Sequence, residues 1–516
     1  MHDFLNEPLI PIDNPDGSAE VVSLPALLAR LSQGTVVGFP GLIVHQRQPW
    51  YQFLVQLAAI ALDRDGRAAL PPDAAVWRTV LAALTPDLAD SAWSLVVEDS
   101  RRPALFQPPS AEGGLDGYGP LGDTPDAIDI LVTAKNHDVK AARMGAAAPH
   151  HWLYALVTLQ TLQGFLGAGN YGIARMNGGF ASRVQVDAVP DLDWGARFRS
   201  GVALLLDQRR RGSPLSFQPA TGKALLWLEA WNGEDRLILE DLDPHFIEVC
   251  RRVRLVRAGG TGASVALGRT TRAARIEAKD YKGAVDDPWI PVDPKNAAAL
   301  TVGGGGFHYR KLVDILYGDD YEPPASLCRG GEAAILHCQV LVHGQGKTDG
   351  HYERTLPARH LKALARRDAP ERALLHKLAQ RMIEDAAAVK KALKRGLVVL
   401  LNGGFPADPA KPLKFDDNRP DRWLDDLDLR IDEIFFAHLW TLADAGGDDA
   451  RAAAATVWQR DLRTEAELRF ESALDQMPAP SARRERARAH AQAAFRSALG
   501  KALDHLTQPQ SHGTAP

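Results

Sequence analysis

The sequence is short of cysteine, of long apolar runs and of net charge. Its 516 residues include only three cysteines, Cys250, Cys328 and Cys338, and no CxxC pair, which argues against a disulfide framework and a cysteine zinc site. No run of about 18 apolar residues occurs, so we expect no transmembrane helix. The N-terminus lacks the charged and apolar segments of a secretory signal. We therefore expect a cytoplasmic protein with reduced thiols.

Catalytic motifs are also missing. The sequence contains no GxSxG, no HExxH and no recognisable pair of catalytic carboxylates. The formal net charge of −4 argues against a uniformly basic coat for nucleic acid but does not exclude a local basic groove, because phosphate binding depends on clustered charge. These features favour a binding protein over an enzyme, and we expect neither a cofactor nor a bound metal.

The first two thirds of the chain show an irregular pattern with frequent glycine and proline. Leu9–Ile12 predicts an edge strand, and apolar residues at helical spacing predict helices at Pro49–Leu62 and His151–Leu166. Residues 249–276 hold seven arginines and no acidic residue. Two basic strands could therefore lie side by side around a turn at Ala258–Gly262, which favours a polyanion or an acidic protein as partner.

The last third of the chain is helical. The 3.6-residue period of its apolar residues predicts four helices, at 371–401, 420–446, 449–476 and 481–506. Alanine-rich stretches at Ala452–Ala455 and Ala487–Ala494 suit close helix packing. We predict an α+β fold in three parts: a large irregular mixed domain over 1–357, a four-helix bundle over 358–507 and a disordered tail over 508–516.

Residues 343–350 imitate a phosphate-binding loop. Residues 346–348, Gly-Lys-Thr, match the second half of GxxxxGK[ST], in which glycine lets the backbone fold around phosphates. Leu341 stands where the first glycine should be, and the Asp-Gly pair at 349–350 interrupts the helix that should follow. A tight, exposed polar turn is favoured over nucleotide hydrolysis, with a plain hairpin tip as the alternative.

A second polar segment, Lys135–Lys140, carries an Asn-His-Asp cluster. Together with His150 and His151 it could suggest a metal-dependent nuclease. Metal ligands need a rigid frame, whereas the stretch over 141–148 is rich in alanine and glycine. A flexible loop whose lysines bind phosphate and whose asparagine reads base edges is favoured, and a solvated surface loop is the alternative.

A third candidate is the glycine-rich segment that follows the helix predicted at His151–Leu166. Gly167, Gly169 and Gly172 form a GxGxxG motif, but a dinucleotide-binding fold needs that motif between a strand and a helix. Glycines that let the backbone approach a duplex, with Arg175 on a phosphate, fit better. A structural glycine bend is the alternative.

The order of these features resembles the large subunit of type I-E CRISPR Cascade, the CasA family. The matching features are a Pro-x-Ile-Pro strand, the Lys-Asn-His-Asp loop, the glycine-rich loop ending in Asn-Gly-Gly, the segment Gly344–Arg354 and the helical bundle. The string within Gln345–Arg354 is the most specific part. The resemblance covers nearly the whole chain.

The resemblance implies a non-catalytic protein that recognises the protospacer-adjacent motif through the minor groove of duplex DNA and starts to unwind it. It implies three DNA-binding elements. The glycine loop would be formed here by Gly167, Gly169, Asn170, Tyr171, Arg175, Asn177, Gly178 and Gly179. The lysine finger would be Lys279 or Lys282, and the wedge would be formed by Gln345, Gly346, Lys347 and Thr348. It implies that a docking loop meets the 5′ handle of the crRNA and the backbone subunit, formed by Lys135, Asn136, His137, Asp138 and Lys140.

The same resemblance implies several partners. These are the backbone, small and 5′-handle-binding subunits of a crRNA-containing complex, double-stranded target DNA with its displaced strand, and a nuclease-helicase. Some members carry paired cysteines where this chain has Arg251–Arg275; here only Cys250 remains, so we predict no zinc, and two arginine-rich strands would replace the metal. The alternative from another class is a nucleotide- or metal-dependent nucleic-acid enzyme that uses residues 344–348 or 135–138.

Overall fold

The internal contacts of the computed structural model divide the chain into two compact units, Met1–Phe307 with Asp319–Ala365, and His308–Gly318 with Arg366–Pro516. The sequence did not predict that His308–Gly318 groups with the C-terminal helices. The structure describes residues 2–130, 147–178, 183–258, 264–328, 334–344, 347–360, 369–406, 413, 418–477 and 483–504. The side chains at 343, 344, 347 and 348 lie outside this description.

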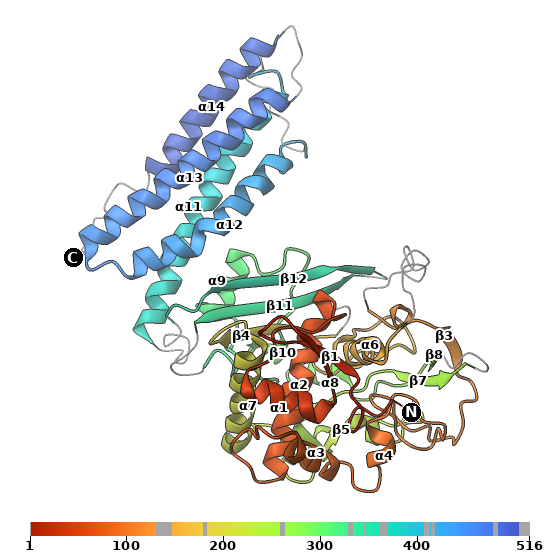
Figure 1. The fold of residues 1–516 in the computed structure, drawn as a ribbon. Coiled ribbons are helices and arrows are strands. Elements are labelled where there is room, and N and C mark those ends of the chain that lie inside the picture. Colours follow the sequence, from red (N-terminus) through yellow and green to blue (C-terminus); the bar gives the residue numbers. More distant parts are fainter. Residues whose placement is uncertain are drawn as a thin grey trace. The chain divides into compact units, whose positions relative to one another are not determined.

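The N-terminal unit mixes helices with small sheets of two or three strands (Figure 1). Its described helices are α1 Leu24–Gln33, α2 Arg47–Arg64, α3 Ala74–Ala83, α4 Ala89–Ala92, α6 Pro149–Leu162, α7 Trp194–Arg211 and α8 Ala278–Tyr281. Its described strands are β1 Ile10–Asp13, β2 Ala19–Val22, β3 Gly119–Gly122, β4 Gln185–Val189, β5 Lys223–Leu225, β6 Leu242–Ile247, β7 Arg252–Arg257, β8 Ser264–Arg269, β9 Val292–Asp293, β10 Ala298–Ala299, β11 Ile335–Gly344 and β12 Lys347–Pro357. The two sheets of three strands have the orders β12-β11-β4 and β3-β8-β7.

Helix α2 is the centre of this unit. All of its residues from Gln48 to Leu62 are buried, and α3, α6, α7 and β6 pack around it. The Gln48 side chain donates to the carbonyl of Arg183 (2.7 Å), and the Gln56 side chain donates to that of His245 (2.9 Å). Short strands leave many backbone groups without a ladder partner, and buried glutamines supply the missing hydrogen bonds.

Most of the predicted local structure of this unit is confirmed. The helix predicted at Pro49–Leu62 is α2, and the strand at Leu9–Ile12 corresponds to β1, which pairs antiparallel with β2. The helix predicted to run to Leu166 is α6, which ends earlier, at Leu162. The two arginine-rich strands do lie side by side, as the antiparallel pair β7 and β8.

The C-terminal unit is the predicted four-helix bundle. Its helices are α11 Pro370–Leu401, α12 Asp421–Ala443, α13 Asp448–Gln476 and α14 Arg484–Asp504, joined by α9 Tyr309–Leu316. Helix α11 packs against the other three long helices. A Cβ atom on Gly396 would lie 2.7 Å from Phe495 and 2.8 Å from the ring of Phe470, so this glycine allows α11 to approach that stacked aromatic pair closely.

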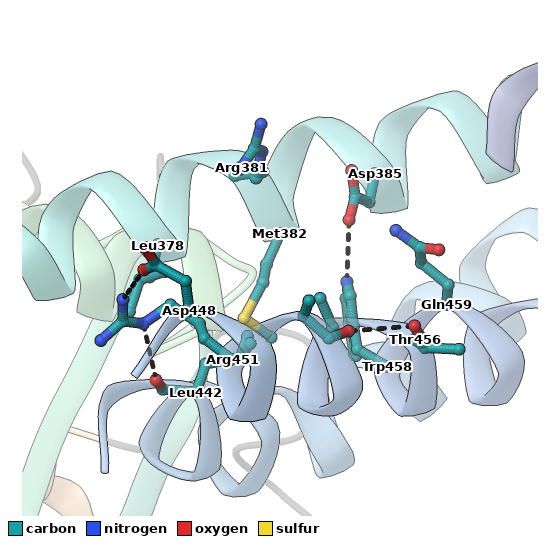
Figure 2. A pocket seen from close by; sticks show the side chains of 12 residues that line it. Leu378, Arg381, Met382, Asp385, Leu442, Asp448, Arg451, Thr456, Trp458 and Gln459 are labelled. Carbon is teal, nitrogen blue, oxygen red and sulfur yellow. Dashed lines mark hydrogen bonds and ion pairs between the residues drawn. The ribbon is translucent and has the colours of Figure 1, made fainter. Parts of the chain in front are cut away.

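One of the two alanine-rich stretches was misinterpreted. Ala487, Ala491 and Ala494 are buried and pack closely, as predicted. Ala452–Ala455, however, are exposed or half-buried, and two of them line a hollow of about 420 Å³ between α11 and α13 (Figure 2). Alanine permits close packing but does not cause it, because its methyl group buries little apolar area.

A buried carboxylate lies beside that hollow. The indole Nε1–H of Trp458 on α13 donates to Asp385 Oδ2 on α11 (3.2 Å; Figure 2). Asp385 is 6% exposed, and this burial raises the pKa of its carboxyl to about 6.

A second aspartate joins α9 to the bundle. Asp428 on α12 contacts Lys390 Nζ (2.9 Å), His308 Nε2 (3.4 Å) and Arg310 (3.5 Å). Burial opposes its ionisation, but the hydrogen bonds from His308 and Lys390 and the nearby positive charges outweigh burial, so the pKa of Asp428 lies well below its ordinary value. The Asp428 cluster therefore fixes the short helix α9 to the long helices.

Among the described residues, none of the helices combines the length and the apolar character that crossing a membrane requires.

Candidate nucleic-acid interface

The glycine loop, defined here as residues 163–178, begins directly after helix α6 and has no regular structure. It therefore lacks the strand before and the helix after it that a dinucleotide-binding motif requires. Two of its glycines allow close packing. A Cβ atom on Gly169, whose φ is +85°, would lie 2.8 Å from Thr270, and one on Gly172 would lie 2.6 Å from the sulfur of Met176 and 2.8 Å from the backbone of Gly164.

The fold places one lysine candidate at the glycine loop. A hollow of about 390 Å³ opens beside the loop, lined among others by Phe165, Tyr171, Met176, Gly178, Glu277 and Lys279. The loop is bound to the segment before Lys279, because Thr271 N donates to Gly169 O (3.0 Å) and the Tyr171 hydroxyl donates to Arg272 O (3.2 Å). Aromatic rings and a lysine are thus combined at one place.

Lys279 and Lys282 differ in their surroundings. Lys279 is exposed and lines the hollow at the glycine loop. Lys282 has a left-handed backbone, with φ +47°, and its ammonium group donates to the carbonyl of Asn296 (3.2 Å). Strand β10 supports the loop, since Asn177 donates to Ala299 O (3.2 Å). The Lys279 ammonium is thus the better placed of the two for a ligand bound at the loop.

Arg175 does not offer its charge to a ligand in this structure. Its side chain is 2% exposed, and its guanidinium lies 3.8 Å from the centre of the Phe246 ring. It forms ion pairs with Glu248 (3.2 Å) and Asp287 (3.0 Å). The predicted contact of Arg175 with a phosphate is therefore wrong for this structure, because both sides of the guanidinium are already occupied. Arg175 instead anchors the loop from inside the unit.

The arginine-rich segment is mostly interior and is not the basic surface that its charge count suggested. Arg251, Arg252, Arg254 and Arg275 are all buried. Arg254, for example, donates to the carbonyls of Arg102 (3.0 Å), Gln107 (3.3 Å) and Val97 (3.2 Å). The guanidinium has five N–H donors, which lets one arginine satisfy several loop carbonyls.

Arg272 is exposed, as is Arg257, and it is a site residue that the sequence did not single out. Its side chain is 83% exposed and pairs with the exposed Glu234 (2.6 Å). Its carbonyl accepts from Tyr171, so it borders the glycine loop. Arg272 differs from the buried arginines of this segment only in the direction of its side chain. The number of arginines in a sequence does not show which of them point outward.

The segment that imitates a phosphate-binding loop lies at the end of a long β-hairpin. Strands β11 and β12 lie side by side (Figure 1), and their register runs from Ile335 opposite Pro357 to Gly344 opposite Lys347. Lys347 therefore begins a strand, whereas the lysine of a P-loop begins a helix. The register places Gly344 opposite Lys347, but Gln345 and Gly346, which connect them, lie outside the described residues, so the tight polar turn stays a prediction.

Hydrogen bonds fix the hairpin at its base. The buried His337 donates through Nε2 to Glu353 on the opposite strand (2.7 Å), and mainly for this reason the pKa of Glu353 falls to about 2. The Tyr352 hydroxyl donates to Gly304 O (2.6 Å), and Arg354 donates to Phe307 O (2.7 Å). The segment 299–307 thus contacts the glycine loop at one end and the hairpin at the other.

Some predicted site residues lie outside the described residues, namely Lys135, Asn136, His137, Asp138, Lys140 and Gly179. His151 is not available as a metal ligand of a nuclease, because its Nδ1 accepts a hydrogen bond from Ala148 N at the start of α6 (3.2 Å). Burial beside His151 lowers the pKa of His150 to about 4. In the part of the chain that the structure describes, no three His, Cys, Asp or Glu side chains come together as a metal site.

No protein-family model matches the chain, and no curated protein matches its sequence. Solved structures do match, and they define its class: the fold is that of the CRISPR-associated protein Cse1, also named CasA. The CasA resemblance is thereby confirmed for the fold.

Three structures illustrate the match. Cse1 from Acidimicrobium ferrooxidans is 17% identical, with a TM-score of 0.62 over 98% of this chain and 99% of that one. CasA from Thermus thermophilus is 14% identical, with a TM-score of 0.59 over 97% and 99%. A chain of a CRISPR RNA-guided surveillance complex is 14% identical, with a TM-score of 0.55 over 96% and 99%.

Proposed function

We propose that this chain is the non-catalytic large subunit of a crRNA-guided, type I-E Cascade surveillance complex, and that it recognises the protospacer-adjacent motif in duplex DNA. The observation that carries the proposal is the fold, which extends over nearly all of both chains in the comparison with Cse1 and with a subunit of a CRISPR RNA-guided surveillance complex. In such a complex base pairing with the guide carries the sequence specificity, and the protein reads only a short flanking motif.

The glycine loop and Lys279 form the proposed contact with the minor groove. The minor groove offers a degenerate pattern of acceptors, which backbone N–H groups, asparagine and lysine can read. Asn170 and Tyr171 are half-buried on the loop, and the exposed Lys279 lines the same hollow as Tyr171. We assign the lysine finger to Lys279 and add Arg272 as a phosphate contact, because the ion pair of Arg272 with Glu234 is exposed and therefore weak.

The connection between β11 and β12 is the proposed wedge, with Gln345, Gly346, Lys347 and Thr348 entering between the DNA strands. A wedge must resist the duplex that it opens, and a hairpin fixed by cross-strand hydrogen bonds and by the segment 299–307 suits that task. Opening the first base pairs costs a few kcal/mol, which contacts made by the wedge offset.

The proposed partners follow from the same assignment. Lys135–Lys140 docks at the 5′ handle of the crRNA and the neighbouring backbone subunit, near the subunit that binds that handle. The bundle contacts the small subunits and the displaced strand, and the assembled complex recruits the nuclease-helicase.

The lysine assignment is tested in the reconstituted complex with Lys279→Ala and Lys282→Ala. We expect Lys279→Ala to weaken binding to motif-bearing duplex about tenfold, a loss of roughly 1.4 kcal/mol, and to reduce the salt dependence of binding. Lys282→Ala should change affinity less than twofold, because its ammonium is bonded to the protein. Equal effects of the two variants, or an effect of Lys282→Ala alone, would contradict the assignment.

The wedge is tested by changing Gln345 and Lys347 together to alanine. Affinity for a duplex whose first base pairs are already mismatched should be preserved, because no opening is needed there. R-loop formation on a fully paired target should slow about tenfold or more, equivalent to roughly 1.4 kcal/mol in the barrier. Unchanged R-loop formation on the paired target would rule out the wedge.

A further inference from the structure

Four buried charged side chains lie directly beneath the glycine loop, and they are called the buried quartet here. Its members are Arg175 on the loop, Arg183 before β4, Glu248 after β6 and Asp287 after α8; none of their side chains is more than 5% exposed. Two positive and two negative charges balance one another. Burial of such charges is costly unless each is paired, so their arrangement strongly constrains the backbone that carries them.

Glu248 holds the backbone of the glycine loop as well as its arginine. One carboxylate oxygen accepts from the backbone N–H of Ala174 (2.6 Å), and the other accepts from the guanidinium of Arg175 (3.2 Å). Since a single side chain bonds two consecutive residues, it fixes both the position and the direction of the loop there.

The other half of the buried quartet connects this anchor to the centre of the unit. Asp287 pairs with Arg175 (3.0 Å) and with Arg183 (2.6 Å), and it also accepts from the backbone N–H of Trp289 (3.0 Å). Arg183 donates to the side chain of Gln56 on helix α2 (3.3 Å). Burial lowers the pKa of Arg183 to about 10, so the side chain stays protonated at neutral pH.

We propose that Arg175 and Glu248 are positioning residues: they hold the glycine loop in its DNA-reading conformation before DNA arrives, although neither touches the DNA. A glycine-rich segment has many accessible conformations, and ordering it on binding would weaken affinity. Because of the buried quartet, the loop is already ordered when the chain folds, before any DNA binds. The consequence for DNA rests on the proposed function, whereas the effect on the loop does not.

A buried ion cluster could also serve only the stability of the fold. A second buried cluster in the same unit provides a matched control that separates this role from positioning of the glycine loop. In the same unit Arg209 pairs with Asp243 (2.6 Å) and Asp63 (2.8 Å), and Asp243 is fully buried on strand β6. This second cluster holds the turn at Pro219 through Arg209 (2.7 Å) instead of the glycine loop. Asp243→Asn should therefore lower stability as Glu248→Gln does, without affecting the glycine loop.

The first experiment measures hydrogen exchange of backbone amides in the free full-length chain. Glu248→Gln should accelerate exchange within residues 164–178 about tenfold and leave the turn near 219–222 unchanged, and Asp243→Asn should do the opposite. Unchanged exchange in the loop of Glu248→Gln, or equal acceleration of the loop in both variants, would overturn the proposal.

A second variant keeps the test meaningful if Glu248→Gln folds poorly. Arg175→Met combined with Glu248→Gln removes one charge of each sign, so the remaining pair, Arg183 and Asp287, is still balanced. We expect this double variant to regain most of the stability that Glu248→Gln loses, while its loop still exchanges faster. Recovery of loop protection together with stability would show that the buried quartet serves stability alone.

Binding of motif-bearing duplex by the reconstituted complex then measures the consequence. The double variant should bind about tenfold more weakly, and Asp243→Asn should bind as the unchanged chain does. If the double variant binds with full affinity although its loop is loosened, the positioning role is wrong. If the unchanged complex ignores the motif, the proposed function fails, but the exchange result still decides whether the buried quartet sets the loop.

Discussion

Buried arginine is the feature of single residues that most changes how this sequence is interpreted. A run of arginines without acids is usually exposed, and here four of them bond loop carbonyls inside the N-terminal unit. The reason is the scarcity of regular structure: carbonyls outside ladders need donors, and arginine is the side chain with the most donors. The sequence revealed the charges but not their direction.

Arg254 and Arg272 allow a direct test of this distinction. Arg254→Met removes a donor from three carbonyls and leaves its own buried position without a charged group, and it should destabilise the chain by about 3 kcal/mol, because buried or half-buried carbonyls lose a hydrogen bond. Arg272→Ala should change stability by less than about 0.5 kcal/mol, since its side chain is exposed. Urea unfolding of both variants measures this difference, and equal losses would contradict it.

For DNA binding we expect the reverse of the effects on stability: Arg272→Ala should have the larger effect and Arg254→Met the smaller one. In the assembled complex Arg272→Ala should reduce the slope of log affinity against log salt by about 1, as expected for one lost phosphate contact. Arg254→Met should leave that slope unchanged. If the salt slope changed only in Arg254→Met, the buried arginines and not Arg272 would contribute to DNA binding.

A glycine substitution tests the packing of the loop. In Gly172→Ala the new methyl group would lie 2.6 Å from the Met176 sulfur and 2.8 Å from the Gly164 backbone, so the loop must shift. We expect about a tenfold loss of affinity for motif-bearing duplex by the assembled complex. Gly114→Ala is the control, because no atom lies within 4 Å of its added methyl group. Full affinity of Gly172→Ala would show that the loop does not read DNA.

At the scale of elements, periodicity predicted the long helices well and packing poorly. The four C-terminal helices and α2 were predicted because their apolar residues recur at helical spacing over several turns. Helices α1 and α7 were not predicted, although Ser23 and Asp193 cap their N-termini. The exposure of Ala452–Ala455 was missed because alanine fits equally well against a neighbouring helix or beside a hollow.

Asp428 should make the bundle sensitive to acid. Its folded pKa lies below the ordinary value of 3.8, so it contributes stability above about pH 4 that is lost as the pH falls further. Asp428→Asn should cost about 2 kcal/mol at pH 7 and flatten the loss of stability below pH 4. Urea unfolding at pH 3, 4 and 7 measures both effects. An unchanged acid response would show that α9 is not held by this carboxylate.

Asp385 should act in the opposite direction. Its folded pKa of about 6 exceeds the ordinary 3.8, so its contribution is fully present below about pH 4 and is lost as the pH rises through 6. Asp385→Asn should therefore stabilise the bundle at pH 7, by about 1–3 kcal/mol, and remove the decline between pH 4 and 6. The amide oxygen can still accept from Trp458. Destabilisation by Asp385→Asn at pH 7 would contradict this reasoning.

For the whole molecule, the order of segments was more informative than any one motif. The phosphate-loop and dinucleotide motifs each fail for a local reason, but the order of the segments along the chain, followed by a bundle, indicated the Cse1 fold. The meeting of the glycine loop with Lys279 was not predictable from spacing, since it depends on Thr271 and Tyr171 bonding across the fold. The buried quartet was hidden for the same reason, as its two acidic members are far in sequence from its two arginines.

The most direct test of the central claim is motif-dependent DNA binding by the crRNA-guided complex, reconstituted with and without this chain. Binding is measured on two guide-matched duplexes that differ only in the flanking motif. With the chain present, we predict at least tenfold tighter binding to the duplex with the correct motif; without it, the two duplexes should bind equally. If the complex that lacks this chain discriminates the two duplexes equally well, the chain does not read the motif.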